Sequence, residues 1–270
     1  METMTRRKRK RNLLPVVLAV VLAVIVAALA LLVFRSLLPA AQREEPDPHA
    51  GQIYVNDGAN MVWLTPHENF AVSPLHRWQF VTLEGQPWYV GSEFAVRRGV
   101  DLSVFQKNVD WAKAAESGVE FAVIRLGFRG YGKGALQPDD LFDSHLDGAH
   151  AAGIDAGVYF FSQALTAEEG REEAQYVLER LKGRKLELPV YFDWEPISAE
   201  DSRTNGYDYA NLTDSAVAFC QTIQAAGYQA GEYINRQQGY YHYDLSRLAD
   251  YSLWVADYNA YPDFYYRFDL

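Results

Sequence analysis

The sequence predicts an α/β fold, in which an irregular TIM-like β/α barrel follows an N-terminal transmembrane helix and a small β appendage. From about residue 98 onward, short apolar stretches of strand length alternate with stretches of helix length. Strands that are apolar on both faces are typical of a parallel sheet covered by helices. Acidic residues follow several of these strands, at the end where barrel enzymes carry their chemistry.

The N-terminus combines a basic cluster with a long uncharged apolar segment. Residues 13–34 carry no charge, and as a helix they are long enough to cross a hydrocarbon layer of roughly 30 Å. Six consecutive basic residues at 6–11 precede them, and such residues stay on the cytoplasmic side. We predict a cytoplasmic tail over 1–12, a single transmembrane anchor over 13–34 and an extracellular remainder. The alternative is a signal peptide that is cleaved near Ala41.

The predicted extracellular part is acidic. The chain of 270 residues has a formal net charge of −10. Residues 1–35 hold seven basic residues and one acidic residue, which leaves 18 Lys and Arg against 34 Asp and Glu over 36–270, a net charge of −16. This charge argues against a nucleic acid partner, because phosphates are bound by basic surfaces. Cys220 is the only cysteine, so no intramolecular disulfide is expected, and its apolar neighbours predict a buried structural thiol.

Residues 35–97 precede the regular part of the chain. Residues 35–50 contain three prolines among mixed charges, a composition typical of a solvated linker. Residues 51–97 contain short stretches that resemble strands. These stretches cover 61–64, 78–83 and 87–90, and a plausible hairpin turn lies at 84–86. We interpret 51–97 as a small β appendage.

Residues 98–270 show the regular alternation and are predicted to form the barrel. The expected strands cover 99–101, 121–125, 157–161, 188–194, 230–234 and 253–256. The expected helices cover 111–117, 142–152, 167–182 and 213–226. Gly118 and Gly153 follow the first two helices, and a glycine commonly ends a helix at this position.

Four acidic residues follow strands at the predicted carboxyl-terminal rim. Asp193 and Glu195 lie two residues apart, so they share a strand face with Cα atoms about 6.6 Å apart. Asp101 and Asp257 follow the first and last strands, although Asp101 could instead cap a helix. Two close carboxyl groups cannot both ionise freely, so the more buried one tends to keep a proton. An acid beside a carboxylate is the equipment that glycoside hydrolysis needs.

Aromatic residues accompany these acids. Tyr159 and Phe161 share a strand face, Tyr233 ends another strand, and Trp254 and Tyr258 flank the last acid. Aromatic rings stack on the apolar faces of sugars, but they are also ordinary core residues in strands. We treat these five residues as candidate substrate-binding residues.

We expect no metal and no cofactor. His145 and His150 are five residues apart, unlike the i, i+4 pair of a helical zinc site, and His242 stands alone. The glycine-rich segment 127–132 has neither the phosphate-loop motif nor the dinucleotide-binding motif. Nothing in the sequence indicates an oligomeric state.

Five motifs occur in a fixed order between Arg98 and the last residue. They are Gly99-Val100-Asp101-Leu102-Ser103, the strand 121–127, Ala151-Ala152-Gly153 with the strand 157–161, Asp193-Trp194-Glu195, and the segment 253–258. As an ordered set they resemble the family 25 glycoside hydrolases, the Chalaropsis-type lysozymes or N-acetylmuramidases.

The resemblance implies a flattened β/α barrel that cleaves the β-1,4 bond between N-acetylmuramic acid and N-acetylglucosamine in peptidoglycan glycan strands. By position, Glu195 matches the general acid, and Asp193 matches the neighbour that orients or stabilises the substrate acetamido group. Asp101 and Asp257 match two supporting acids. Direct attack by water and assistance from the acetamido group both remain open. Family members continue past the equivalent of Leu270 into a strand beginning Trp-Gln-Tyr, so we expect the barrel to lack its last strand.

Three functions compete. The first is a membrane-anchored muramidase that remodels the wall from the outer face of the cell membrane. The second is a non-catalytic peptidoglycan-binding or scaffold protein with a degenerate muramidase fold, and the third is a hydrolase of another acetamido polysaccharide such as chitin. Retention of both Asp193 and Glu195 favours the first. For residues 51–97, a minor module that contacts the wall is the alternative to an appendage.

Overall fold

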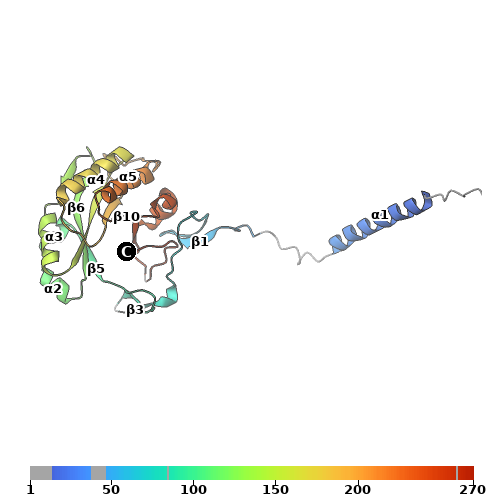
Figure 1. Cartoon of the computed structure of the whole chain (residues 1–270), viewed down its shortest axis with the longest axis horizontal. Helices are drawn as coiled ribbons and strands as arrows, with labels where there is room; N and C mark the ends of the chain where they lie inside the picture. The colour runs from blue at the N-terminus through green and yellow to red at the C-terminus, as the bar shows by residue number, and fades with distance from the viewer. Residues whose placement is uncertain (1–13, 38–46, 84, 260) are drawn as a thin grey trace, which may run out of the picture. The chain divides into compact units, whose positions relative to one another are not determined.

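The computed structural model describes residues 14–37, 47–83, 85–259 and 261–270. They belong to two units, Met1–Ala50 and Gly51–Leu270. The first unit contains helix α1 (Leu14–Leu37), in which Val17–Ser36 is long and apolar enough to cross a membrane (Figure 1). A signal sequence near an N-terminus has the same character. The predicted tail over 1–12 and most of the predicted linker over 35–50 lie outside the described residues.

Residues 51–97 form two separate antiparallel hairpins. Strand β1 (Ile53–Asn56) pairs with β2 (Met61–Leu64), and β3 (Phe80–Leu83) pairs with β4 (Gln86–Tyr89). The sequence did not predict β1, and the predicted strand 78–83 is shortened because Arg77–Gln79 forms a 3-10 turn, η2. The second hairpin turns through Gly85, whose φ of 78° suits glycine.

The first hairpin packs on the large domain. Val55 is 6 % exposed and belongs to the main hydrophobic core, and the neighbouring apolar side chains Ile53, Val62 and Leu64 pack partly buried against that core. The hairpins and the sheet that follows them therefore belong to one compact unit, Gly51–Leu270.

The large domain is built on a curled, mainly parallel sheet. Its strand order is β11-β10-β9-β8-β6-β5, and the short antiparallel strand β7 (Leu136–Pro138) pairs with β6. The parallel strands are β5 (Gly99–Leu102), β6 (Phe121–Arg129), β8 (Asp155–Ser162), β9 (Val190–Trp194), β10 (Ala230–Asn235) and β11 (Ser252–Ala256). The helices are α2 (Trp111–Glu116), α3 (Phe142–Ala151), α4 (Ala167–Leu181) and α5 (Leu212–Ala225). Each of these ten elements lies where the sequence predicts it, with ends that differ by a few residues.

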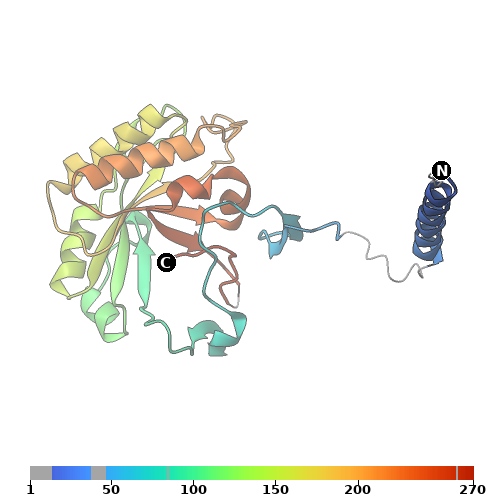
Figure 2. The same cartoon turned by 45° about the vertical axis from the view of Figure 1, so that its right-hand side comes forward.

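The sheet is an open half-barrel. Strands β5 and β11 are its two edges, and among the described residues no strand joins them (Figure 2). Leu270 lies along the outer edge of β11, where its carbonyl accepts a hydrogen bond from the Val255 amide at 2.7 Å and its amide donates to Leu253 at 3.2 Å. The fold class is therefore α/β, and a closed barrel is not formed by the part of the chain that the structure describes.

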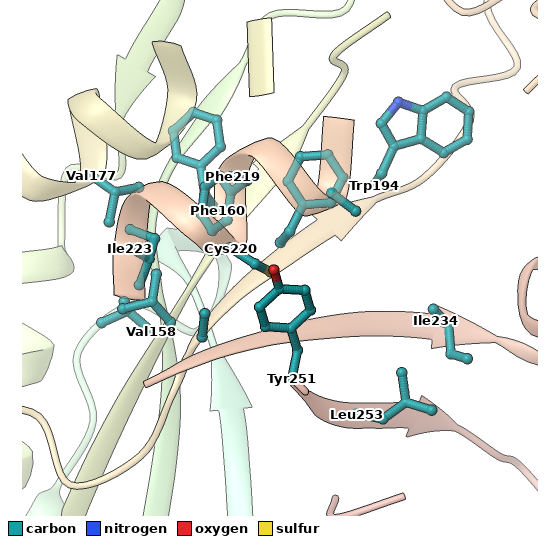
Figure 3. Close-up of a cluster of buried hydrophobic side chains, with 14 of the residues drawn as sticks. Val158, Phe160, Val177, Trp194, Phe219, Cys220, Ile223, Ile234, Tyr251 and Leu253 are labelled. Carbon is teal, nitrogen blue, oxygen red and sulfur yellow. The ribbon is translucent and has the colours of Figure 1, made fainter. Parts of the chain in front are cut away.

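The main core lies between the convex face of the sheet and the helices. Val158 and Phe160 of β8 point toward α4 and α5, where they meet Val177, Phe219 and Ile223 (Figure 3). Cys220 is fully buried in the same cluster, and burial raises the pKa of its thiol. The prediction of a buried structural thiol is confirmed.

The concave face carries a second, smaller cluster. Phe121, Val123 and Tyr191 are buried there, and the partly buried side chains that pack on them are Tyr159, Leu188, Trp254 and Leu270. Gly231 makes room for the ring of Tyr191, because a Cβ at this position would lie 2.5 Å from it. The floor of the half-barrel is thus apolar near the amino-terminal ends of the strands.

Candidate active site

Strand register brings the polar residues of the concave face together. Asp193 of β9 pairs with Tyr233 of β10 on one side and with Phe161 of β8 on the other. Paired residues in neighbouring strands project to the same face. Arg125 pairs with Tyr159, and Asp101 pairs with Val123, two residues before Arg125, so these side chains share the concave face as well.

Asp193 is the buried member of the acid pair. The residue is 6 % exposed, and its Oδ1 atom has no hydrogen-bond partner among the described residues. Burial raises the pKa of Asp193 well above its usual value, and the nearby charges of Glu195 and Asp101 add to this effect, whereas Arg125 opposes it. Asp193 therefore tends to keep its proton at a pH where an exposed aspartate is ionised.

Glu195 lies one residue beyond β9 and is only half-buried. The negative charge of its carboxylate acts on the nearby Tyr233 hydroxyl from the neighbouring strand. Burial raises the pKa of Tyr233, and the charges of Glu195 and Asp193 raise it further, so the hydroxyl stays protonated. A neutral tyrosine therefore lies beside the accessible acid.

Side-chain amides fix the backbone around Glu195. Gln163 donates to the Glu195 carbonyl, and Gln238 donates to the carbonyl of Trp194. Trp194 points to the opposite face, where its indole is fully buried and donates from Nε1 to Ala164 at 2.8 Å. The Asp-Trp-Glu triplet therefore alternates between the site and the core, as a strand with one polar face requires.

Two charged residues that the sequence reasoning did not single out belong to the site. Arg125 Nε and Nη2 each lie 2.8 Å from Asp139 Oδ2. The Asp139 side chain is fully buried and also accepts from the Val104 amide at 2.9 Å. A charged residue in an otherwise apolar strand needs an ionic or hydrogen-bonding partner. Arg125 is such a residue, because it lies in the apolar stretch 121–126, so the sequence could have predicted that it has a partner.

The predicted aromatic residues fall into two groups. Trp254 makes edge-to-face contacts with Tyr233, Tyr191 and Tyr159, with ring centroids 4.7, 5.4 and 6.0 Å apart. This group forms the floor beneath the acids, and Phe161 is half-buried beside Asp193 on the same face. By contrast, Tyr258 is 96 % exposed, yet it lies close enough to Tyr233 to raise the pKa of that residue. Tyr258 is therefore a rim residue.

Asp257 is engaged elsewhere. Its Oδ2 atom accepts from Arg236 Nη2 at 2.6 Å and from the Asp263 amide at 3.2 Å, and its Oδ1 atom accepts from the Asn259 amide at 3.0 Å. The Asp257 and Arg236 side chains are only 9 % and 5 % exposed. These contacts fix the loop that follows β11 and hold the Asp257 carboxylate in a buried ion pair.

The histidines considered in the sequence lie in separate places. His145 contacts Trp111 edge to face, His150 contacts Glu187 Oε2 at 3.1 Å, and His242 stacks on Tyr209 with ring centroids 3.7 Å apart. Within the described ranges, no group of three or more His, Cys, Asp or Glu side chains is arranged to hold a metal ion.

A cavity of about 930 Å³ lies away from the acids. Its walls include Phe121, Leu188 and Tyr191 near the amino-terminal ends of the strands, together with hairpin β3–β4 and the segment 267–270. Catalytic groups in β/α barrels lie at the opposite, carboxyl-terminal ends. The position of the carboxyl groups therefore indicates the candidate site better than the size of this cavity.

A curled parallel sheet with paired carboxyl groups at its carboxyl-terminal end is typical of enzymes that hydrolyse glycosidic bonds. Residues 100–268, more than half of the chain, match the family described as glycosyl hydrolases family 25. The chain belongs to this family.

Individual relatives agree with this assignment. The autolytic lysozyme of Clostridium acetobutylicum is 25 % identical over 164 residues, which cover 60 % of this chain and 45 % of that protein. Lysozyme M1 of Streptomyces globisporus is 30 % identical over 79 residues, which cover 29 % of this chain and 25 % of that protein. This chain thus matches less than half the length of these curated relatives.

Solved structures share the fold. The autolysin LytC from Streptococcus pneumoniae in complex with a synthetic peptidoglycan ligand superposes with a TM-score of 0.54 and 22 % identity, covering 67 % of this chain and 44 % of that chain. The CTP1L endolysin superposes with a TM-score of 0.52 and 20 % identity, covering 64 % and 58 % of the two chains.

Proposed function

We propose that this chain is a muramidase that hydrolyses the β-1,4 bond between N-acetylmuramic acid and N-acetylglucosamine in peptidoglycan. The observation that carries the proposal is the buried carboxyl of Asp193 beside the accessible carboxyl of Glu195, on the sheet of a family 25 glycoside hydrolase. Relatives named as lysozymes, and an autolysin solved with a peptidoglycan ligand, support this substrate.

Asp193 and Glu195 act as one coupled pair in this proposal. Burial favours the proton on Asp193, whereas Glu195 is the member that a glycosidic oxygen can reach. In this proposal the two neighbouring carboxyl groups exchange that proton. Glu195 passes this proton to the leaving oxygen as the glycosidic bond breaks, and the remaining negative charge faces the positive charge that develops on the sugar. Water then adds to the anomeric carbon and returns a proton to the pair.

The surrounding residues hold this pair in place. The protonated Tyr233 lies beside Glu195, and Arg125, fixed by Asp139, limits the accumulation of negative charge around Asp193 and Asp101. The sugar rings lie over the aromatic floor of Tyr159, Tyr233 and Trp254, with Phe161 at its side and Tyr258 at the rim. Attack by water alone and attack assisted by the substrate acetamido group both use this arrangement.

We also propose that residues 13–34 anchor the enzyme in the cell membrane, with the tail 1–12 in the cytoplasm and residues 35–270 outside. The apolar helix α1 and the extracellular position of peptidoglycan support this topology. On intact protoplasts, protease should reach residues 36–270 while the protein stays in the membrane fraction at high salt. Release into the medium with a new N-terminus near Ala41 would instead indicate a cleaved signal peptide.

The deciding experiment is the release of reducing ends from purified peptidoglycan by the full chain in detergent. Products that end in reducing N-acetylmuramic acid support a muramidase. Binding to peptidoglycan without release would support the non-catalytic scaffold, and faster release from chitin would support the third candidate. Glu195→Gln is the negative control, because a contaminating hydrolase would still act in its preparation.

A further inference from the structure

The hairpin β1–β2 lies outside the family-matched residues 100–268 and is fixed to the rim of the candidate active site. Arg236, the residue after β10, donates from Nη1 to the Asn56 carbonyl at 2.9 Å and from Nη2 to Asp257 at 2.6 Å. Tyr241 donates to Asp57 Oδ2 at 2.8 Å. The hairpin turn is thus held at the carboxyl-terminal ends of β10 and β11, on the same end of the sheet as Asp193 and Glu195 at the end of the neighbouring strand β9.

The hairpin has one buried face and one aromatic face. Its inward face carries the apolar residues that pack on the main core, while Tyr54 and Trp63 occupy the outward face as a cross-strand pair. Their ring centroids are 4.8 Å apart with an interplanar angle of 33°, and the residues are 54 % and 43 % exposed. A large aromatic surface therefore faces away from the core.

Arg236 connects the hairpin with the loop that follows β11. It binds both the Asn56 carbonyl and Asp257, and Tyr258, the next residue after Asp257, lies close enough to Tyr233 to raise its pKa. Tyr54 is two residues from Asn56, about 7 Å along a strand. The aromatic pair therefore belongs to a hairpin that is anchored beside the site through Asn56 and Asp57.

We propose that Tyr54 and Trp63 form a distal glycan-binding subsite, which stacks on a pyranose ring of the same strand that Glu195 cleaves. The proposal rests on the proposed function. Aromatic faces offer a rigid apolar surface to the C–H groups of a sugar, and a second contact on one polymer raises affinity through effective concentration. A membrane surface is the competing occupant, and the net charge of −16 over residues 36–270 opposes adsorption to anionic lipid.

The test compares long and short substrates with the full chain in detergent. Tyr54→Ala and Trp63→Ala should each raise KM for long, peptide-free glycan strands by about tenfold, the effect of losing ~1.4 kcal/mol of binding. Their kcat, and their turnover of a tetrasaccharide too short to reach the hairpin, should stay at the wild-type level. Trp78→Ala is the matched control, since Trp78 is 74 % exposed but precedes the other hairpin.

Each outcome bears on the proposal. An unchanged KM for long strands would overturn it, as would an equal loss on long and short substrates. Loss of co-sedimentation with anionic vesicles without a change in KM would identify a membrane contact instead. Trp63→Met keeps apolar volume without a flat ring, so it tests the subsite if Trp63→Ala does not fold. If the wild type turns over neither substrate, the proposed function fails. Binding to insoluble peptidoglycan then tests the subsite separately, because Tyr54→Ala and Trp63→Ala should bind more weakly than wild type.

Discussion

Arg236 binds Asp257 across 2.6 Å, and the two side chains are almost completely buried. The Nη1 atom of the same guanidinium donates a hydrogen bond to the Asn56 carbonyl, so Arg236 joins the loop after β11 to the first hairpin. An acid that seems catalytic by its position at a strand end is thus bound to a structural partner, and its role can be separated from that of Glu195 by mutation.

Asp257→Asn should destabilise the protein more than it slows the reaction. The substitution removes one carboxylate partner of the buried Arg236 guanidinium and leaves Asp263 as the other, at a cost on the order of 2 kcal/mol. We expect a lower melting temperature and a kcat within about tenfold of wild type for the folded variant, well short of the loss expected from a general acid. Asp250→Asn, at an exposed position, is the control. A normal melting temperature with abolished turnover would make Asp257 a supporting acid after all.

Glu195→Gln should lower kcat by more than about a hundredfold, because the amide keeps the shape of the side chain but has no proton to transfer. Binding to insoluble peptidoglycan and the melting temperature should stay close to wild type. The assay is the release of reducing ends, with Glu200→Gln as a matched control at an exposed position. Residual activity above a hundredth would remove Glu195 from the role of acid.

Asp193→Asn should also lower kcat strongly, because an amide cannot balance positive charge at the sugar ring or on the acetamido nitrogen. Groups that act in one step combine non-additively. The double variant Asp193→Asn with Glu195→Gln should therefore be little slower than the slower single variant. Effects that multiply would assign Asp193 a structural role only.

The same substitution should stabilise the fold at neutral pH. Burial and negative neighbours raise the pKa of Asp193 in the folded state well above its ordinary value of 3.8. Between the unfolded and folded pKa values the folded state binds more protons, so the free energy of unfolding falls as pH rises through this window. The Asp193→Asn variant does not lose stability in this way. Its free energy of unfolding at pH 7 should exceed that of wild type by on the order of 1 kcal/mol or more. In denaturant titrations this difference between variant and wild type should disappear below about pH 4, where the Asp193 carboxyl group is neutral in both the folded and the unfolded state. A variant less stable than wild type at pH 7 would contradict the assignment.

Arg125→Gln and Asp101→Asn should move the alkaline limb of the pH–rate profile in opposite directions. Arg125 lowers the pKa of Asp193 and Asp101 raises it. Losing the cation should therefore let the pair keep its proton to higher pH, while losing the anion should release the proton at lower pH. The profile of kcat against pH gives the answer. Shifts in the same direction would mean that the two residues act on the fold and not on the charge of the pair.

Strand and helix order could be predicted from the sequence because each element has a local cause. Apolar runs such as 121–124 and 190–192 must be buried on both faces, and glycines end the intervening helices. The i, i+2 spacing of Asp193 and Glu195 follows from strand geometry alone. In the hairpin β1–β2 the sequence predicted β2 but not β1, whose four residues are too few for their periodicity to identify a strand.

By itself, then, the sequence determined the α/β alternation, the apolar N-terminal helix, and the strand ends at which acids stand. Only the tertiary structure decided which acid has which partner: Asp257 with Arg236, Asp139 with Arg125, and Asp193 without a hydrogen bond at Oδ1 among the described residues. Periodicity states which face a side chain occupies, since that depends on a few neighbouring residues. Burial and ion pairing depend on the curl of the sheet and on segments far apart in the chain, such as those of Arg236 and Asn56, which are 180 residues apart. Those contacts set the pKa of a carboxyl group, and they separate the acid pair from a structural aspartate.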